Sequence, residues 1–356
     1  MKKKLFKMLL VTILVFVATM PMMGCRSRQL GEVVAISAGD RHSLALDAYG
    51  NVWAWGRKID SLSPVQVTNG THFVQIGAGL GYSVALDESG NIWAWGFHVL
   101  LETGATQRVE NPTQITQEIN FIYINVGSSY SLAIDSDGNI WAWGIPFPGG
   151  VKNFIPVQVT NDRRFVSIVA GFFNLAIDDG GNIWQWQRTT LWGEQHITRE
   201  PVQITNDIEL VSISGGDSYN WALDINGNLW AWWPFNRLDQ DNPMVTNNFM
   251  PTRIFYEQKF SQISNSNHVL AIDMQKNIWA WGMNVVGQVG SGTITNFIDA
   301  PTKIKEGQFV NVSAAGNHSL AMCDKGRLFS WGGNFSGQLG DGTTICRNLP
   351  VQINRV

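Results

Sequence analysis

Residues 42–56 read HSLALDAYGNVWAWG, and variants of this phrase with its tryptophan pair occur seven times along the chain. Another clear copy, YSLAIDSDGNIWAWG, occupies residues 130–144. The second tryptophan position of the copies falls at residues 55, 95, 143, 186, 232, 281 and 331, which gives spacings of 40 to 50 residues. A period of this size is typical of β-propellers and related repeat arrays. We therefore expect one repeat domain over residues 33–356.

Each repeat contains four short apolar runs bounded by Gly, Pro, Asn or Asp, a pattern that predicts four strands. In the third run of the first repeat, Trp53 and Trp55 point to one face of the strand, and Val52 and Ala54 point to the other. Neither face is polar, so each sheet has to be covered on both sides, as in a ring of stacked blades. The fourth run begins with proline in every repeat, which suits the first residue of a strand. The sequence thus predicts an all-β, seven-bladed β-propeller with four-stranded antiparallel blades.

The order of the runs suggests how the ring closes. The chain enters the pattern with the first run at Val33 and leaves it with the fourth run at Ile353. We expect residues 350–353 to pair with the sheet of residues 33–56. The C-terminal strand would then close the ring against the N-terminal blade and remove an open sheet edge.

Thirteen tryptophans belong to the repeated pairs and are expected to be structural. Each buried indole N–H should have a hydrogen-bond partner. These residues are Trp53, Trp55, Trp93, Trp95, Trp141, Trp143, Trp184, Trp186, Trp230, Trp232, Trp279, Trp281 and Trp331.

The recurring polar residues also have structural interpretations. His42, His268 and His318 share one repeat position, and a catalytic histidine has no reason to recur around a ring. Because neighbours on a strand point to opposite faces, the adjacent His-Ser pairs are not expected to be catalytic dyads. The acidic segment 135–139 is interpreted as a turn capped by Asp135, since a calcium loop needs further spaced oxygen ligands. The sequence contains no zinc spacing, phosphate-binding loop or nucleophile elbow, and we expect no enzyme activity, no cofactor and no metal.

The repeat unit resembles the regulator of chromosome condensation repeat. The resemblance covers residues 31–356, and the last two repeats add that family's loop at residues 284–292 and 334–342, while the first five have lost it. The resemblance implies a seven-bladed propeller. The nuclear member of the family promotes nucleotide exchange on a small GTPase, and similar exported propellers inhibit β-lactamases, so both activities are alternatives to simple binding.

The N-terminus reads as a bacterial lipoprotein signal. Four lysines precede an apolar run at residues 8–23, and Gly24-Cys25 resembles the end of a lipobox. We expect a signal peptide at 1–24, lipidation of Cys25, a tether at 25–32, and an exported protein on the extracytoplasmic face of the cell membrane. An ordinary cleaved signal or an uncleaved anchor are the alternatives. Removing the four lysines changes the formal net charge from −3 to −7, which argues against a nucleic-acid partner.

The variable loops after each tryptophan pair are the expected contact regions, because function concentrates in loops on rigid scaffolds. We expect a monomeric, non-enzymatic binding module for a protein or cell-envelope ligand, with inhibition of a secreted enzyme, nucleotide exchange and polysaccharide hydrolysis as alternatives. Whether Cys323 and Cys346 form a disulfide is left open. The candidate contact residues are Phe97, His98, Phe147, Trp192, His196, Trp233, Phe235, Arg237 and Phe249.

Overall fold

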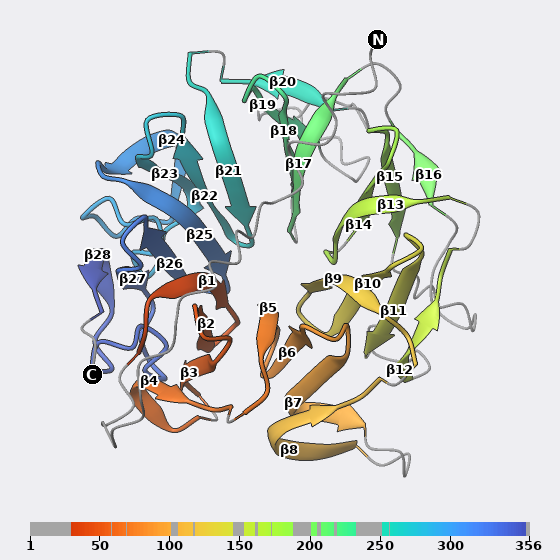
Figure 1. The fold of residues 1–356 in the computed structure, drawn as a ribbon. Helices are drawn as coiled ribbons and strands as arrows, with labels where there is room; N and C mark the ends of the chain where they lie inside the picture. Colours follow the sequence, from red (N-terminus) through yellow and green to blue (C-terminus); the bar gives the residue numbers. More distant parts are fainter. Residues whose placement is uncertain are drawn as a thin grey trace.

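The computed structural model describes residues 30–353 except residues 58, 69, 101–105, 117, 145–152, 161–162, 172, 188–200, 205–207, 217–218, 233–250 and 256. In this part of the chain, 28 strands form seven four-stranded antiparallel sheets around a central axis (Figure 1). The predicted all-β, seven-bladed propeller is confirmed. We number the sheets as blades 1 to 7 in chain order. No helix in the described residues is long and apolar enough to span a membrane.

Each blade runs from an inner first strand to an outer fourth strand. The first strands are β1 (Val33–Ala38), β5 (Phe73–Ala78), β9 (Phe121–Val126), β13 (Phe165–Val169), β17 (Leu210–Gly215), β21 (Phe260–Asn265) and β25 (Phe309–Ala315). The second strands are β2 (His42–Asp47), β6 (Tyr82–Asp87), β10 (Tyr130–Asp135), β14 (Phe173–Asp178), β18 (Asn220–Asp224), β22 (His268–Asp273) and β26 (His318–Cys323). The third strands are β3 (Val52–Gly56), β7 (Ile92–Leu100), β11 (Ile140–Gly144), β15 (Ile183–Gln187), β19 (Leu229–Trp232), β23 (Ile278–Met283) and β27 (Leu328–Gly332). The fourth strands are β4 (Ser61–Gln66), β8 (Thr106–Gln114), β12 (Asn153–Gln158), β16 (Val202–Gln203), β20 (Thr252–Ile254), β24 (Phe297–Lys305) and β28 (Arg347–Gln352).

The hydrophobic core is divided among the spaces between blades. Between blades 1 and 2, the small Ala54 and Val52 of β3 pack in one buried cluster with Phe73 and Trp95 of blade 2. Such a match of large against small residues fills the space between sheets to the density of a protein interior. The alternation of tryptophan with alanine in each third strand therefore follows from the stacking of blades.

Polar side chains of one blade protect the inner edge of the next. Ser313 Oγ of blade 7 accepts a hydrogen bond from the Ala38 backbone N–H of blade 1, and Ser37 Oγ does the same for Ala78 of blade 2. Edge strands expose unpaired backbone groups that invite aberrant pairing. These side chains satisfy such groups and tie successive first strands together.

The fourth-strand prolines protect the outer edge, but their position differs from the prediction. Pro64, for example, lies inside β4 rather than at its start. The pairing of β3 with β4 is irregular there, because Ala54 faces Val65 whereas Gly56 faces Ser61. Proline cannot donate to a sheet ladder and is tolerated at bulges on edge strands. Only Pro201 and Pro251 directly precede their strands, β16 and β20.

The predicted closure by strand pairing is wrong. The C-terminal strand β28 pairs with β27 inside blade 7, and blade 1 has its own fourth strand, β4. Each repeat is a complete blade, so no strand is left over. The ring closes where β1 lies beside β25 (Figure 1), through a buried cluster that includes Leu30, Trp55 and Ile353. Side-chain packing joins the two ends of the propeller.

Antiparallel connectivity gives the ring two different faces. We call the face with the connections between third and fourth strands the loop face, and it also holds the turns between first and second strands. The opposite face, the turn face, holds the turns between second and third strands and the links between blades. The chain enters blade 1 on the turn face, where the Glu32 carbonyl accepts a hydrogen bond from Ala48 N at 2.8 Å.

Candidate binding face

Every aspartate of the repeated turn is consumed by structural hydrogen bonds. Asp135 Oδ1 accepts the backbone N–H groups of Asp137 at 3.0 Å and Asn139 at 2.9 Å, and Asp135 Oδ2 accepts Trp141 Nε1 at 2.8 Å. The same set recurs at Asp47, Asp87, Asp178, Asp224 and Asp273. The predicted capped turn is confirmed.

The hydrogen bonds also favour the ionised carboxylate, with a lowered pKa, at Asp87, Asp135, Asp178, Asp224 and Asp273. Burial by itself would raise the pKa of Asp135, but the bonds from Asn139, Trp141 and the turn N–H groups outweigh it and lower the pKa. Through the bond to the indole N–H, each of these turns anchors the first tryptophan of its pair.

The described residues contain no cluster of three or more His, Cys, Asp or Glu side chains that could hold a metal ion.

Blade 7 replaces the turn aspartate by Cys323. Burial would raise the pKa of this thiol, but hydrogen bonds from Arg327 and the Lys325 backbone lower it below its ordinary value. Cys323 and Cys346 are both free thiols, so the disulfide left open by the sequence does not form in this structure.

The repeated histidines connect neighbouring blades. His42 Nε2 lies 3.0 Å from Ser83 Oγ of blade 2, and His318 Nε2 lies 2.8 Å from Ser43 Oγ of blade 1. The serines that follow His42 and His318 in sequence are thus not their partners, which agrees with the prediction. Each of these histidines bonds instead to the serine of the next blade. Tyr82 fills the same role in blade 2, with its hydroxyl 3.2 Å from Ser131 Oγ. This pairing across blades was missed because a linear sequence does not show which residues of adjacent repeats meet.

The loops retained in blades 6 and 7 lock onto the following blade. The Gln338 carbonyl of blade 7 accepts Ser43 Oγ and Trp55 Nε1 of blade 1, both at 2.8 Å. In blade 6 the Gln288 carbonyl accepts Ser319 Oγ of blade 7 at 2.7 Å. These loops are parts of the blade interfaces.

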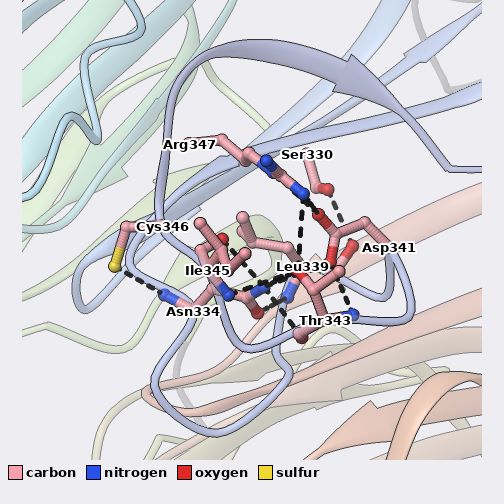
Figure 2. Close-up of polar contacts among 8 residues, drawn as sticks. All are labelled: Ser330, Asn334, Leu339, Asp341, Thr343, Ile345, Cys346 and Arg347. Atoms are coloured by element: carbon pink, nitrogen blue, oxygen red, sulfur yellow. Dashed lines mark hydrogen bonds and ion pairs between the residues drawn. The ribbon is translucent and has the colours of Figure 1, made fainter.

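Side-chain bonds also fix the shape of the blade 7 loop (Figure 2). Asn334 Nδ2 donates to the carbonyls of Thr343 and Ile345, and Asn334 Oδ1 accepts Leu339 N at 3.0 Å. Arg347 Nε donates to Asp341 Oδ2 at 2.8 Å. The loop therefore has a defined conformation before any partner arrives.

Large apolar side chains project from these two fixed loops and the adjoining outer strands. Phe335 is 71% exposed, although the residues around it in the loop, Asn334 and Gln338, are buried. The exposed apolar residues here are Val285, Ile294, Phe297, Phe335, Ile345 and Leu349.

The sequence-predicted contact residues belong to segments in or after the third strands of blades 2 to 5. Phe97 and His98 fall in β7, but their side chains are outside the described part of the chain. The others lie outside the described residues altogether: Phe147, Trp192, His196, Trp233, Phe235, Arg237 and Phe249. The blade 6 and 7 loops were interpreted from sequence as family scaffold, and their exposed positions could have been found as the apolar residues between the fixed Asn, Gly and Gln.

Indole partners are only partly as expected. The first tryptophan of each pair bonds to the turn aspartate, but among the second tryptophans Trp95, Trp186, Trp281 and Trp331 have no N–H partner within the described residues. Trp232 Nε1 bonds instead to Gln185 Oε1 of blade 4 at 2.9 Å. A glutamine side chain here replaces the loop carbonyl that blade 7 supplies to Trp55.

Comparison with known families supports the repeat assignment. Two family models described as the regulator of chromosome condensation (RCC1) repeat match the chain, one at residues 277–322 and 325–356 and the other at 33–57 and 309–338. The matched segments include both retained loops. The search of curated proteins found no match.

Solved structures share the architecture at low sequence identity. Human WBSCR16 matches with a TM-score of 0.67 and 17% identity, covering 83% of this chain and 84% of that one. Prp20p from Saccharomyces cerevisiae, described with its binding to Gsp1p and histones, gives 0.68 and 19%, covering 83% and 84%. The ectodomain of the receptor kinase CR4 from Physcomitrella patens gives 0.57 and 14%, covering 85% and 74%. At these identities the similarity shows the fold.

Proposed function

We propose that this chain, a seven-bladed propeller of the RCC1 repeat family, is a non-enzymatic binding scaffold that recognises a partner protein through its loop face. The structural roles of the polar residues that recur around the ring support a non-enzymatic function. The turn aspartates cap turns and the buried histidines join blades, so the side chains of both sets already make structural hydrogen bonds.

The observation that carries the proposal is the set of exposed apolar side chains on the fixed loops of blades 6 and 7. Exposed apolar groups in a patch commonly mark interaction sites. The blade 7 loop is already ordered by Asn334, Gln338 and the Arg347–Asp341 pair. Asn284 and Gln288 make the corresponding bonds in the blade 6 loop. A preordered loop loses little conformational entropy on binding, which favours affinity.

The charge of this surface defines the kind of partner. Residues 283–298 contain no charged side chain. In the blade 7 loop the acidic Asp341 is only 9% exposed and is paired with Arg347 at 2.8 Å. We therefore expect a protein partner that presents an uncharged, apolar surface, since a charged partner would lose hydration without gaining an opposite charge.

The export and anchoring of the chain are part of the proposal. The chain reaches the ring on the turn face, and Leu30 is already buried in the closing cluster. The segment from Cys25 to Leu30 could span at most roughly 18 Å. A lipid on Cys25 would thus hold the turn face toward the membrane and leave the loop face directed away from it, available to extracytoplasmic proteins.

The test uses the mature chain without the lipid, captured on beads through its C-terminus and exposed to envelope extract of the producing cells. We expect the parent chain to retain a protein from the extract. The double variant Phe335→Ser with Ile345→Ser should retain at least tenfold less of it. The matched control is Tyr49→Ser, because Tyr49 is also 71% exposed but lies on the turn face. Equal retention by both variants, or none by the parent, would count against the proposal. If the retained protein is an enzyme and is inhibited, the inhibitor alternative is favoured.

A further inference from the structure

Three buried histidines lie at three consecutive blade interfaces around the point where the ring closes. His268 bridges blades 6 and 7, His318 bridges blades 7 and 1, and His42 bridges blades 1 and 2. The next two interfaces use Tyr82 and Tyr130 at the same repeat position. Histidines, whose ordinary pKa in water is near 6.5, are thus concentrated at the interfaces on either side of the closure.

The hydrogen-bond directions determine the state of two of these rings. Ser43 Oγ donates its single proton to the Gln338 carbonyl, so His318 Nε2 has to donate to Ser43. Ser319 donates to the Gln288 carbonyl in the same way, and His268 Nε2 donates to Ser319. Both imidazoles therefore carry a proton on Nε2, and the charge of each ring depends on its Nδ1.

Protonation would place a second N–H in a site that does not accept it. Nδ1 of His268 and Nδ1 of His318 are buried and have no hydrogen-bond partner among the described residues. Burial lowers the pKa of His42 to about 4, and the pKa of His268 and His318 to about 3. Repulsion from the other two histidines adds to the effect at His318.

Few other charges face these rings. The first strands β1, β5, β21 and β25 carry no ionisable side chain, and neither do β3, β23 and β27. Near His42, Asp40 and Arg41 pair with each other at 3.2 Å, and Arg57 follows β3. The other ionisable groups of the second strands are Tyr82, which occupies the histidine position in β6, and the residues at the far ends of the strands from the histidines. These end residues are Asp47, Asp87, Asp273 and Cys323.

We propose that these three interfaces form an acid-sensitive latch. Protonation of the histidines frees the loops of blades 6 and 7 and opens the ring at the interfaces between blades 6 and 7, 7 and 1, and 1 and 2. The serines that accept from His268 and His318 also hold the two loop carbonyls, so loss of one bond loosens the other. The latch is independent of what the loop face binds.

The direction of the pH dependence follows from linkage. An exposed histidine titrates near pH 6.5, and the closed ring holds these three in the neutral form. The closed state is therefore fully favoured above about pH 6.5 and is weakened as the pH falls below it. Each histidine that gains a proton only on opening raises the opening constant up to about tenfold per pH unit. Among the turn aspartates, hydrogen bonds hold the pKa below its ordinary value, so that they contribute only at lower pH, in Asp87, Asp135, Asp178, Asp224 and Asp273.

The test is hydrogen exchange of the full mature chain at pH 7 and pH 5, corrected for the intrinsic rate. We expect protection of residues 284–296 and 334–346 to fall at least tenfold at pH 5, while blade 3 is unchanged. The triple variant His42→Tyr, His268→Tyr and His318→Tyr adopts the residue that blades 2 and 3 use at this position and should lose the pH effect. His72→Tyr, which alters an exposed histidine, should retain it.

Two results would overturn the latch: equal protection of both loops at the two pH values in the parent chain, or an undiminished effect in the tyrosine variant. If the triple variant does not fold, the single variant His318→Gln gives the same readout, because its amide can still donate to Ser43 but cannot be protonated. An unchanged pH effect at residues 334–346 in that variant would equally refute the proposal.

Discussion

Asp135 shows how a single turn residue can carry several structural tasks. Its two oxygens cap the turn and also hold the Trp141 indole. Its neighbour Asp137 is exposed and contributes only a backbone N–H to Asp135. The two acids look alike in the sequence as parts of one acidic segment, yet only one of them supports the blade.

The pair provides a matched test of this role. Asp135→Ala should lower the free energy of unfolding by about 1–3 kcal/mol, because it leaves buried donors without acceptors. Asp137→Ala should change it by less than about 0.5 kcal/mol, as for an ordinary surface substitution. Urea denaturation measures both. Stabilisation of the parent chain by added calcium would contradict the capped-turn assignment.

Cys323 is the one exception to the turn aspartate in the second strands. Because hydrogen bonds from Arg327 and Lys325 outweigh burial, the thiol has a lowered pKa in the folded chain. A group with a depressed folded pKa stabilises the fold above its unfolded pKa, and this contribution is lost as the pH falls through the folded pKa.

This behaviour can be measured in a Cys25→Ser, Cys346→Ser background. The thiolate absorbance of Cys323 should appear at lower pH in the folded chain than in urea. Arg327→Ala should move the folded midpoint upward. Coincident folded and unfolded titrations would show that the turn does not stabilise the thiolate.

At the scale of elements, the retained loops act as clamps on the next blade. Gly340 has φ 72°, and a Cβ there would lie 2.7 Å from Trp55 Nε1 of blade 1. Gly181 has φ 82° but open space around the position of a Cβ. An alanine at either site meets the same backbone strain, but only one also collides with a neighbouring blade.

The difference between these glycines isolates the clamp. Gly181→Ala should cost about 1 kcal/mol from backbone strain. Gly340→Ala should cost clearly more and should also shift the tryptophan fluorescence, because the loop has to withdraw from Trp55. Equal losses of stability would mean that loop docking contributes little.

Blade 4 carries a replacement for the missing clamp. Gln185 stands where blade 1 has Ala54, and its side-chain oxygen accepts Trp232 Nε1 at 2.9 Å and Asn220 Nδ2 at 3.3 Å. For blade 1, the Gln338 carbonyl of the blade 7 loop accepts the equivalent bonds from Trp55 and Ser43. A glutamine between two tryptophans thus compensates for a lost loop.

A double-mutant cycle tests this replacement. Gln185→Ala should cost about 1–3 kcal/mol by leaving the Trp232 N–H unpaired. In a Trp232→Phe background the same substitution should cost less, because the donor is already gone. Additive losses would show that the two side chains are not coupled.

At the scale of the whole molecule, periodicity predicted the fold because every blade repeats one pattern of apolar residues. The closure was missed because the order of apolar runs is the same whether a blade is completed by its own fourth strand or by a distant one. Phe335 could be located in a family loop, but its exposure depends on how Asn334 and Gln338 turn inward, and that is a property of the folded loop.

The closure has a consequence for chain connectivity. Leu30 and Ile353 share one buried cluster, so a short linker should join them without strain. A circular permutant with new ends between Gly70 and Thr71 keeps all seven blades intact and should fold with nearly unchanged stability. The strand-pairing closure would be favoured instead if this permutant failed to fold while a permutant that leaves blade 1 without its own fourth strand folded normally.

We propose that the loop face of blades 6 and 7 contacts a partner protein. The most direct measurement places a photo-reactive benzophenone amino acid at Phe335 or, as the matched control, at Tyr49 of the full chain in the producing cells. Irradiation should give one defined protein adduct from position 335 that position 49 does not give. No adduct from position 335, or the same adducts from both positions, would contradict the claim.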